Sequence, residues 1–260
     1  MNGVRAMDSA TAARWIERWD RQQEAGMPDR EERFTALIDA VEAGTGRGDP
    51  LVLDIGCGPG SLGARLMERL PEARVVGIDA DPVTLALGRA AHGDAMTFVT
   101  ADLRGPGWLT ALGLDRQPDA AVSTTALHWL PEHALRDMYA ELAAMLRPGG
   151  LFLNGDHLRE DEAQAPALAR LGRALPELED RRRFPDGHGE SWQGWWEAVA
   201  ADESLAPLAA ERTRLRFDAH HGSSRSALLR THVDALRAAG FAEVGTLWQR
   251  GDSRLLAAVR

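Results

Sequence analysis

Three glycines that alternate along the chain could bind a nucleotide-like cofactor. Gly56, Gly58 and Gly60 follow the short apolar run 51–55, in which Asp54 is the only polar residue. Glycine adopts positive φ without steric cost and has no Cβ, so a loop of this composition can bring backbone N–H groups against a ligand. We expect this loop to hold the cofactor, and we expect Asp54 to order the loop from beneath.

A second acid stands where a doubly wound α/β fold binds ribose. Asp79 closes the apolar run 74–78 and follows the last glycine of the loop by 19 residues. A carboxylate offers only acceptors, so it can bind both hydroxyls of a ribose. Asp81 is better placed than Asp79 to cap the helix that follows. We therefore predict that Asp79, with Ala80 beside it, binds the cofactor.

Two motifs of the sequence resemble those of a known enzyme family. The spacing D-x-G-x-G-x-G that begins at Asp54 is similar to the first motif of class I S-adenosylmethionine (SAM) methyltransferases. Leu-Arg-Pro-Gly-Gly at 146–150, placed before an apolar strand, resembles the same superfamily. The resemblance covers about residues 50–156. It implies SAM as the cofactor and S-adenosylhomocysteine (SAH) as the product.

The same resemblance implies further cofactor contacts. Asp102 stands after the third predicted strand, where an acid of these enzymes meets the amino group of adenine, and Leu103 is next to it. Ser123 ends the fourth predicted strand and Thr124 follows it. Ligands of open α/β sheets bind outside the carboxyl ends of the strands. We therefore expect these four residues to face the cofactor.

His128 and Trp129 follow the fourth strand, where a group that acts on the methyl acceptor would stand. His128 could be a base or a hydrogen-bond donor to the substrate, or both side chains could pack beneath the following helix. The Leu-x-Trp context is similar to carboxylate O-methyltransferases, such as the trans-aconitate and juvenile-hormone-acid families. This resemblance implies a carboxylate acceptor, which is already ionised at neutral pH, so that His128 orients it without removing a proton.

Two further histidines are candidates for substrate contact. His157 follows the fifth predicted strand beside Asp156, and His221 ends an insertion. The ligand spacing on one element that a metal site needs is absent, so we predict no metal. The only cysteine, Cys57, excludes an internal disulfide, and its place in the glycine loop favours a small filler over a nucleophile.

These residues need a scaffold that brings their loops together. The alternation of apolar runs and helical segments predicts an α/β fold: a Rossmann-like, seven-stranded, mostly parallel sheet with a C-terminal antiparallel hairpin, helices on both faces and a helical cap. The expected units are an N-terminal helical lid (1–48), the SAM-binding core (49–157), a helical substrate cap (158–221) and a C-terminal helix and hairpin that complete the core (222–260).

Aromatic residues outside the core allow two interpretations. They lie on the two N-terminal helices and in the insertion, as Trp15, Trp19, Phe34, Trp192, Trp195 and Trp196. The N-terminal group either packs on the flank of the sheet or forms a lid over the cofactor. The group in the insertion either anchors the cap onto the core or contacts the substrate.

The composition excludes several classes of partner. All 30 basic residues are arginine and the net charge is −9, so the chain lacks the positive face that a nucleic acid requires. No apolar stretch is long enough to span a membrane and the N-terminus has no signal-peptide pattern, so we expect no membrane partner and a soluble, cytoplasmic protein. The absence of lysine is typical of a GC-rich genome and favours a bacterial source. The sequence leaves open whether the protein forms a homodimer.

The function we predict is SAM-dependent transfer of a methyl group to a small organic acceptor, at a carboxylate or hydroxyl oxygen. Two alternatives stay open, a SAM-fold protein with other chemistry and a non-catalytic binding module. Gly58, Gly60 and Gly63 also match the dinucleotide pattern G-x-G-x-x-G. An NAD(P)-dependent oxidoreductase is nevertheless disfavoured, because a chain without lysine has no Tyr-x-x-x-Lys pair.

Overall fold

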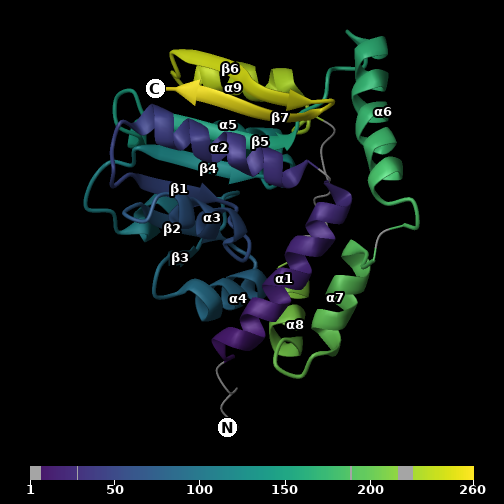
Figure 1. Cartoon of the computed structure of the whole chain (residues 1–260). Helices are drawn as coiled ribbons and strands as arrows, with labels where there is room; N and C mark the ends of the chain where they lie inside the picture. The colour runs from purple at the N-terminus through teal and green to yellow at the C-terminus, as the bar shows by residue number, and fades with distance from the viewer. Residues whose placement is uncertain (1–6, 28, 188, 216–224) are drawn as a thin grey trace.

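A seven-stranded sheet forms the centre of the computed structural model, which describes residues 7–27, 29–187, 189–215 and 225–260 (Figure 1). The strand order is β3-β2-β1-β4-β5-β7-β6, in which β1 to β5 run parallel and β7 pairs antiparallel with β5 and β6. The strands are β1 Leu51–Ile55, β2 Arg74–Asp79, β3 Thr97–Thr100, β4 Ala120–Thr124, β5 Leu151–His157, β6 Glu243–Arg250 and β7 Ser253–Val259. The predicted sheet, mostly parallel with a C-terminal antiparallel hairpin, is confirmed.

The composition of each strand explains its place in the sheet. Strand β1 is buried along its whole length, as is β4 except at its last residue, which suits inner strands covered on both faces. Strand β6 lies at the edge and is largely exposed. The chain order reverses between β1 and β4. A reversal of this kind opens a crevice at the carboxyl ends of the strands, where ligands of such sheets bind.

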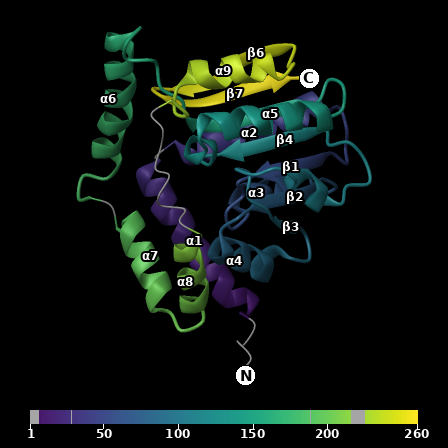
Figure 2. The same cartoon turned by 180° about the vertical axis from the view of Figure 1, so that it is seen from behind.

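Helices cover both faces of the sheet, as the two opposite views show (Figures 1 and 2). One face packs on α2, α3 and α4 through an apolar cluster that includes Phe34, Leu66 and Leu85. The other face packs on α5, α9 and the short 3-10 helix η1 through a cluster that includes Tyr139 and Leu236. The helices are α2 Arg30–Thr45, α3 Ser61–Arg69, α4 Pro82–His92, η1 Trp108–Leu112, α5 Glu132–Met145 and α9 Leu229–Ala238, with a second 3-10 turn, η2 Leu127–Trp129.

A separate layer of helices stands beyond α4 (Figure 1). Helices α1 (Ser9–Gly26), α7 (Trp192–Ala201) and α8 (Ala206–Arg214) share with α4 a small core around the fully buried Trp195. The ring of Trp195 lies edge-on to those of Trp15, Trp19 and Trp196, at centroid distances of 5.8, 4.9 and 4.8 Å. Thus α1 belongs to this layer, whereas α2, which carries Phe34, packs on the sheet.

Helix α6 (Pro166–Arg183) stands at the outside of the molecule, and several of its leucines are exposed (Figure 1). Within the described residues, no helix combines the length and apolarity that crossing a membrane requires.

Local contacts set the bounds of several elements. Helix α1 begins at Ser9 and is capped by Asp8, whose side chain accepts a hydrogen bond from a backbone N–H of the first turn. Strand β5 extends to His157 because it pairs with β7 along its whole length. Helix α9 begins only at Leu229, because the chain before it forms a turn in which Ser226 donates a 2.6 Å hydrogen bond to the carbonyl of Leu130.

Candidate active site

The loop between β1 and α3 depends on glycine at each turn. Gly56, Gly58 and Gly60 have φ of 70°, 54° and 85°. A Cβ on Gly56 would lie 2.4 Å from the Cβ of Ala126, so no side chain fits there. A Cβ on Gly58 would meet no atom within 4 Å, because this residue faces a cavity. The loop therefore leaves room for a ligand directly against its backbone.

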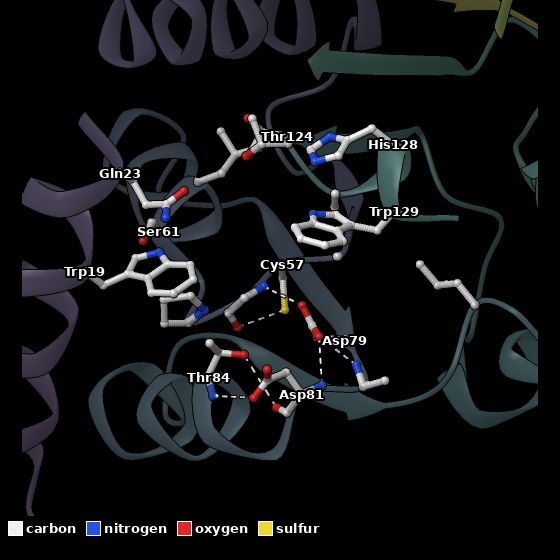
Figure 3. Close-up of a pocket in the computed structure, with 18 of the residues that line it drawn as sticks. Trp19, Gln23, Cys57, Ser61, Asp79, Asp81, Thr84, Thr124, His128 and Trp129 are labelled. Carbon is white, nitrogen blue, oxygen red and sulfur yellow. Dashed lines mark hydrogen bonds between the residues drawn. The ribbon is translucent and has the colours of Figure 1, made fainter. Parts of the chain in front are cut away.

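Asp79, at the end of β2, fixes this loop (Figure 3). Its carboxylate accepts hydrogen bonds from the backbone N–H groups of Gly58 (2.8 Å), Ala80 (2.7 Å) and Asp81 (2.9 Å). Burial raises the pKa of Asp79 to about 6. Asp79 also lines the cavity, and a carboxylate has about four acceptor sites, so one remains for a ligand hydroxyl.

The cavity has a volume of about 520 Å³ and lies over the carboxyl ends of β1, β2, β4 and β5. Most of the residues predicted from the sequence line it: Gly56, Gly58, Asp79, Ala80, Asp102, Leu103, Thr124, His128, Trp129 and His157. Asp54, Gly60 and Ser123 do not line the cavity, and His221 lies outside the described residues. The sheet thus brings together side chains that are up to about a hundred residues apart in the sequence.

Three predicted cofactor residues lie behind the cavity wall. Asp54 is fully buried, and this burial raises its pKa to about 7. Ser123 is also fully buried and donates its hydroxyl to the carbonyl of Ile55 (2.8 Å). A Cβ on Gly60 would lie 2.9 Å from the ring of Phe98, which packs beneath the loop. Asp54 thus lies beneath the loop, as expected, and Gly60 and Ser123 support the cavity wall from behind.

His128, on η2, is held by a buried acid from β5. Its Nδ1 lies 2.8 and 3.0 Å from the two carboxylate oxygens of Asp156, which is fully buried. Burial alone would lower the pKa of His128, but the charge and hydrogen bond of Asp156 outweigh it and raise that pKa above its usual value. Burial alone would raise the pKa of Asp156, but the charge and hydrogen bond of His128 outweigh this effect and hold that pKa well below its ordinary range. Because Nδ1–H donates to Asp156, Nε2 is left for a ligand.

The aromatic wall comes from three parts of the chain. Trp19 on α1, Trp192 and Trp196 on α7, and Trp129 after β4 all line the cavity. Trp19 faces the glycine loop near Ser61 in Figure 3. Trp195 packs helix on helix, while Trp19, Trp192 and Trp196 also reach the cavity, so a lid and a substrate contact remain predictions for these side chains.

The arginines on the cavity wall are engaged by acids of the chain. The ion pairs join Arg30 to Asp20 (2.9 Å), Arg104 to Asp102 (2.6 Å) and Arg212 to Asp81 (2.7 Å). Arg212, from α8, also stacks on Trp196, with its guanidinium carbon 3.8 Å from the ring centroid. Asp102 thus lines the cavity while its carboxylate is held by Arg104, and its contact with adenine remains a prediction.

The remaining candidates have simple structural surroundings. Burial raises the pKa of Cys57 well above its usual value, and its sulfur packs where a Cβ on Gly77 would stand, so this thiol is a loop filler. His157 lines the cavity with its Nδ1 3.3 Å from Asp252. Among the described residues, no three His, Cys, Asp or Glu side chains group as metal ligands.

Sequence reasoning missed several residues of the site. Arg212 and Gln23 line the cavity but carry no local motif. Asp156 stands beside His157 in the sequence, but its pairing with His128 joins β5 to the 3-10 turn η2 that follows β4. The tandem of an acid and a histidine after a predicted strand was the one available signal for that pair.

The chain is similar to known methyltransferases. A family described as "Methyltransferase domain" matches residues 52–150. The trans-aconitate 2-methyltransferase of Azoarcus sp. (strain BH72) is 34% identical over 218 residues, which are 76% of this chain and 80% of that protein. The chain belongs to the class I SAM-dependent methyltransferases. The trans-aconitate 2-methyltransferase of Methylobacterium radiotolerans is 32% identical to this methyltransferase over 209 residues, which are 73% of this chain and 68% of that protein.

A solved structure supports the fold of this methyltransferase. The magnesium protoporphyrin IX methyltransferase of Synechocystis PCC 6803, with bound SAH, aligns with a TM-score of 0.54 over 94% of each chain, at 18% identity. At this identity the likeness concerns the fold alone.

SAM is the cofactor of this methyltransferase, and the cavity suits it. Gly58 leaves open space against the backbone, and Asp79 offers an acceptor at the cavity wall. When bound, SAM supplies a methyl group that its sulfonium sulfur already activates. The protein must then hold an acceptor in line with that group and exclude water, which the tryptophan-lined wall can do.

Proposed function

We propose that this methyltransferase esterifies a carboxylate oxygen of a small organic acid. The observation that carries the proposal is the pairing of His128 with the buried Asp156 at the cavity wall. The names of the relatives from Azoarcus and Methylobacterium, both trans-aconitate 2-methyltransferases, support the same acceptor class.

The His128–Asp156 pair suits an acceptor that is already an anion. A carboxylic acid is ionised at neutral pH and needs no base. Because the pKa of His128 is raised, its ring tends to keep its proton and presents a charged Nε2–H to the cavity. This donor can bind one carboxylate oxygen while the other oxygen attacks the methyl group. His128 therefore orients the acceptor, and Asp156 positions His128.

The other sequence-predicted roles remain part of this proposal. Asp79 and Ala80 bind the ribose of SAM, and Asp102 and Leu103 lie along its adenine. Trp129 and His157 border the acceptor. Helix α1 serves as a lid and the insertion as a substrate cap, because both contribute tryptophans to the cavity wall. The division into units at 48, 157 and 221 rests on these roles.

The test combines product chemistry with a pH profile. Purified protein is incubated with SAM and either trans-aconitate, benzoate or phenol, and both SAH and the methylated product are measured. We expect SAH with the acids and a product that alkali hydrolyses back to the acid, as an ester requires. Turnover of the acid should fall as pH rises above the pKa of His128, because the protonated ring is the active form.

A hydroxyl acceptor predicts the opposite pH dependence. His128 would then have to accept a proton, so the rate would rise with pH and the product, an ether, would resist alkali. That outcome would refute carboxylate methylation. The variant His128→Gln should lower kcat/KM for the acid by about 10–100-fold, as expected for a lost charge-assisted hydrogen bond, and change the SAH Kd less than twofold. His133→Gln, at an exposed histidine of α5, is the matched control.

A further inference from the structure

Arg33, on α2, is a fully buried arginine outside the contacts described so far for the cofactor and the acceptor. Its Nη1 donates to the hydroxyl of Ser253 on β7 (3.0 Å). Its Nη2 lies 3.4 Å from the hydroxyl of Thr124 and 3.5 Å from the sulfur of Met27, both of which are long contacts. Its Nε is buried without a hydrogen-bond partner. The guanidinium thus crosses from α2 to the carboxyl end of β4 with part of its donor capacity unused.

The charge of Arg33 has no ion-pair partner among the described residues. Asp156, Asp29 and Asp252 are close enough to interact with it electrostatically, but none forms an ion pair with it. The carboxylate of Asp156 is committed to His128 and to the backbone N–H of His157 (2.8 Å). Burying a guanidinium without a direct partner is costly, so a protein seldom retains one without a use. The arginines on the cavity wall, in contrast, each have a carboxylate partner.

Arg33 reaches the cavity through its neighbours. Thr124 and Met27, the two groups at Nη2, both line the cavity. A hydroxyl that accepts a hydrogen bond from a guanidinium keeps its own hydrogen free for donation, and the cation strengthens that donor. Thr124 and His128 both lie on the wall at the top of Figure 3. An anion at that wall would meet two donors, each supported from behind by a buried charged residue.

We propose that Arg33 is a positioning and specificity residue that recognises the carboxylate of the methyl acceptor through Thr124. One carboxylate oxygen accepts from the Thr124 hydroxyl, which Arg33 polarises, and the other accepts from Nε2–H of His128. This inference rests on the proposed esterification of an acid. Thr124, which was predicted to contact the cofactor, would then contact the methyl acceptor. The site would select its substrate by one carboxylate group.

The first variant is Arg33→Met, which keeps an unbranched side chain and removes the charge and the donors. Because Arg33 has no direct ion-pair partner among the described residues, its replacement breaks no buried ion pair, so the variant should fold. Thr124→Val, which removes only the hydroxyl, is the second variant. Ser253→Ala is the matched control, because it removes a partner of Arg33 away from the cavity and leaves the charge in place.

Binding of trans-aconitate, benzoate and the neutral benzamide to the SAH complex is measured by calorimetry, together with KM for the acids and the Kd of SAH. We expect Arg33→Met to weaken acid binding by about 30–100-fold, to leave benzamide and SAH within about twofold, and so to abolish the preference for acid over amide. Thr124→Val should have a similar effect, and the double variant should add little to either, because the two residues act as one unit. Ser253→Ala should bind like the wild type.

The outcomes separate this inference from the proposed function. If the wild type esterifies an acid and Arg33→Met does so with the same KM, the role of Arg33 is refuted while the proposed function stands. If the wild type binds none of the acids and methylates phenol, the proposed function falls and takes the inference with it. If Arg33→Met does not fold, an unchanged acid affinity in Thr124→Val is enough to refute recognition of the carboxylate through Thr124.

Discussion

The carboxylate of Asp79 offers the sharpest test of the cofactor site. Replacing it by asparagine keeps the shape but leaves one oxygen and adds an amide N–H₂. The three backbone N–H groups of Gly58, Ala80 and Asp81 now have a single oxygen, with two acceptor sites, and at least one of them must face the new N–H₂. A hydrogen bond to a charged group contributes about 1.5–3 kcal/mol, so a ligand hydroxyl that bound this carboxylate loses a comparable amount.

This loss predicts a SAH Kd that is about 10–100-fold weaker in Asp79→Asn, since about 1.4 kcal/mol corresponds to tenfold. Calorimetric titration with SAH measures it directly. The unfolding temperature of the free protein should change little, because the variant relieves the cost of a buried charge while it loses an acceptor. Asp115→Asn is the control, since Asp115 is an exposed acid paired with Arg74, which lies at the opposite end of β2 from Asp79.

The pH dependence of SAH affinity provides a second, independent test. Burial raises the pKa of Asp79 to about 6, so its carboxylate is the acceptor form only above that pH. SAH affinity of the wild type should therefore fall as pH decreases through about 6, and the Asp79→Asn variant should lack this step. An equal SAH Kd in variant and wild type, or the same pH step in both, would refute the assignment of Asp79 to the ribose.

Two further predictions concern the wall of the cavity. Gly56→Ala should lower the free energy of unfolding by about 2–3 kcal/mol, because alanine is strained at φ 70° and its Cβ would press on Ala126; an unchanged urea midpoint contradicts this. Arg212→Gln removes the ion pair with Asp81, so SAH should bind about 3–10-fold more weakly and trypsin should cleave the segment 158–215 faster. Arg214→Gln, exposed on the same helix, should show neither change.

The parts of the site that the sequence predicted are those determined within a few residues. The glycine loop needs positive φ at alternate positions, and only glycine meets that need cheaply, so its pattern is visible in the sequence. Asp79 is similar, because its partners are its own neighbours and the loop that pairs with its strand. In these elements the residue types that the local backbone conformation requires are also the ones that shape the site, so the sequence reveals both.

The parts that escaped prediction depend on tertiary contacts between distant segments. Arg33 contacts residues 91 and 220 positions away, and nothing in the helix that carries it distinguishes it from a surface arginine. Arg212 meets an acid 131 positions away. Ser123 shows the converse case: its place at the end of a strand predicted that it faces the cofactor, whereas its side chain is fully buried and donates to the carbonyl of Ile55. A charged side chain's role follows from its partner, and the partner is set by the fold.

The turn after β2 connects the cofactor site to the cap. Asp79 directs its carboxylate to the glycine loop, and two residues later Asp81 caps α4 with one oxygen and binds Arg212 of α8 with the other. Because Asp79 also accepts from the N–H of Asp81, a shift of either carboxylate moves the other. A ligand that engages Asp79 therefore acts on the same short turn that holds α8. For this reason the weaker SAH binding expected of Arg212→Gln does not require Arg212 to touch the cofactor.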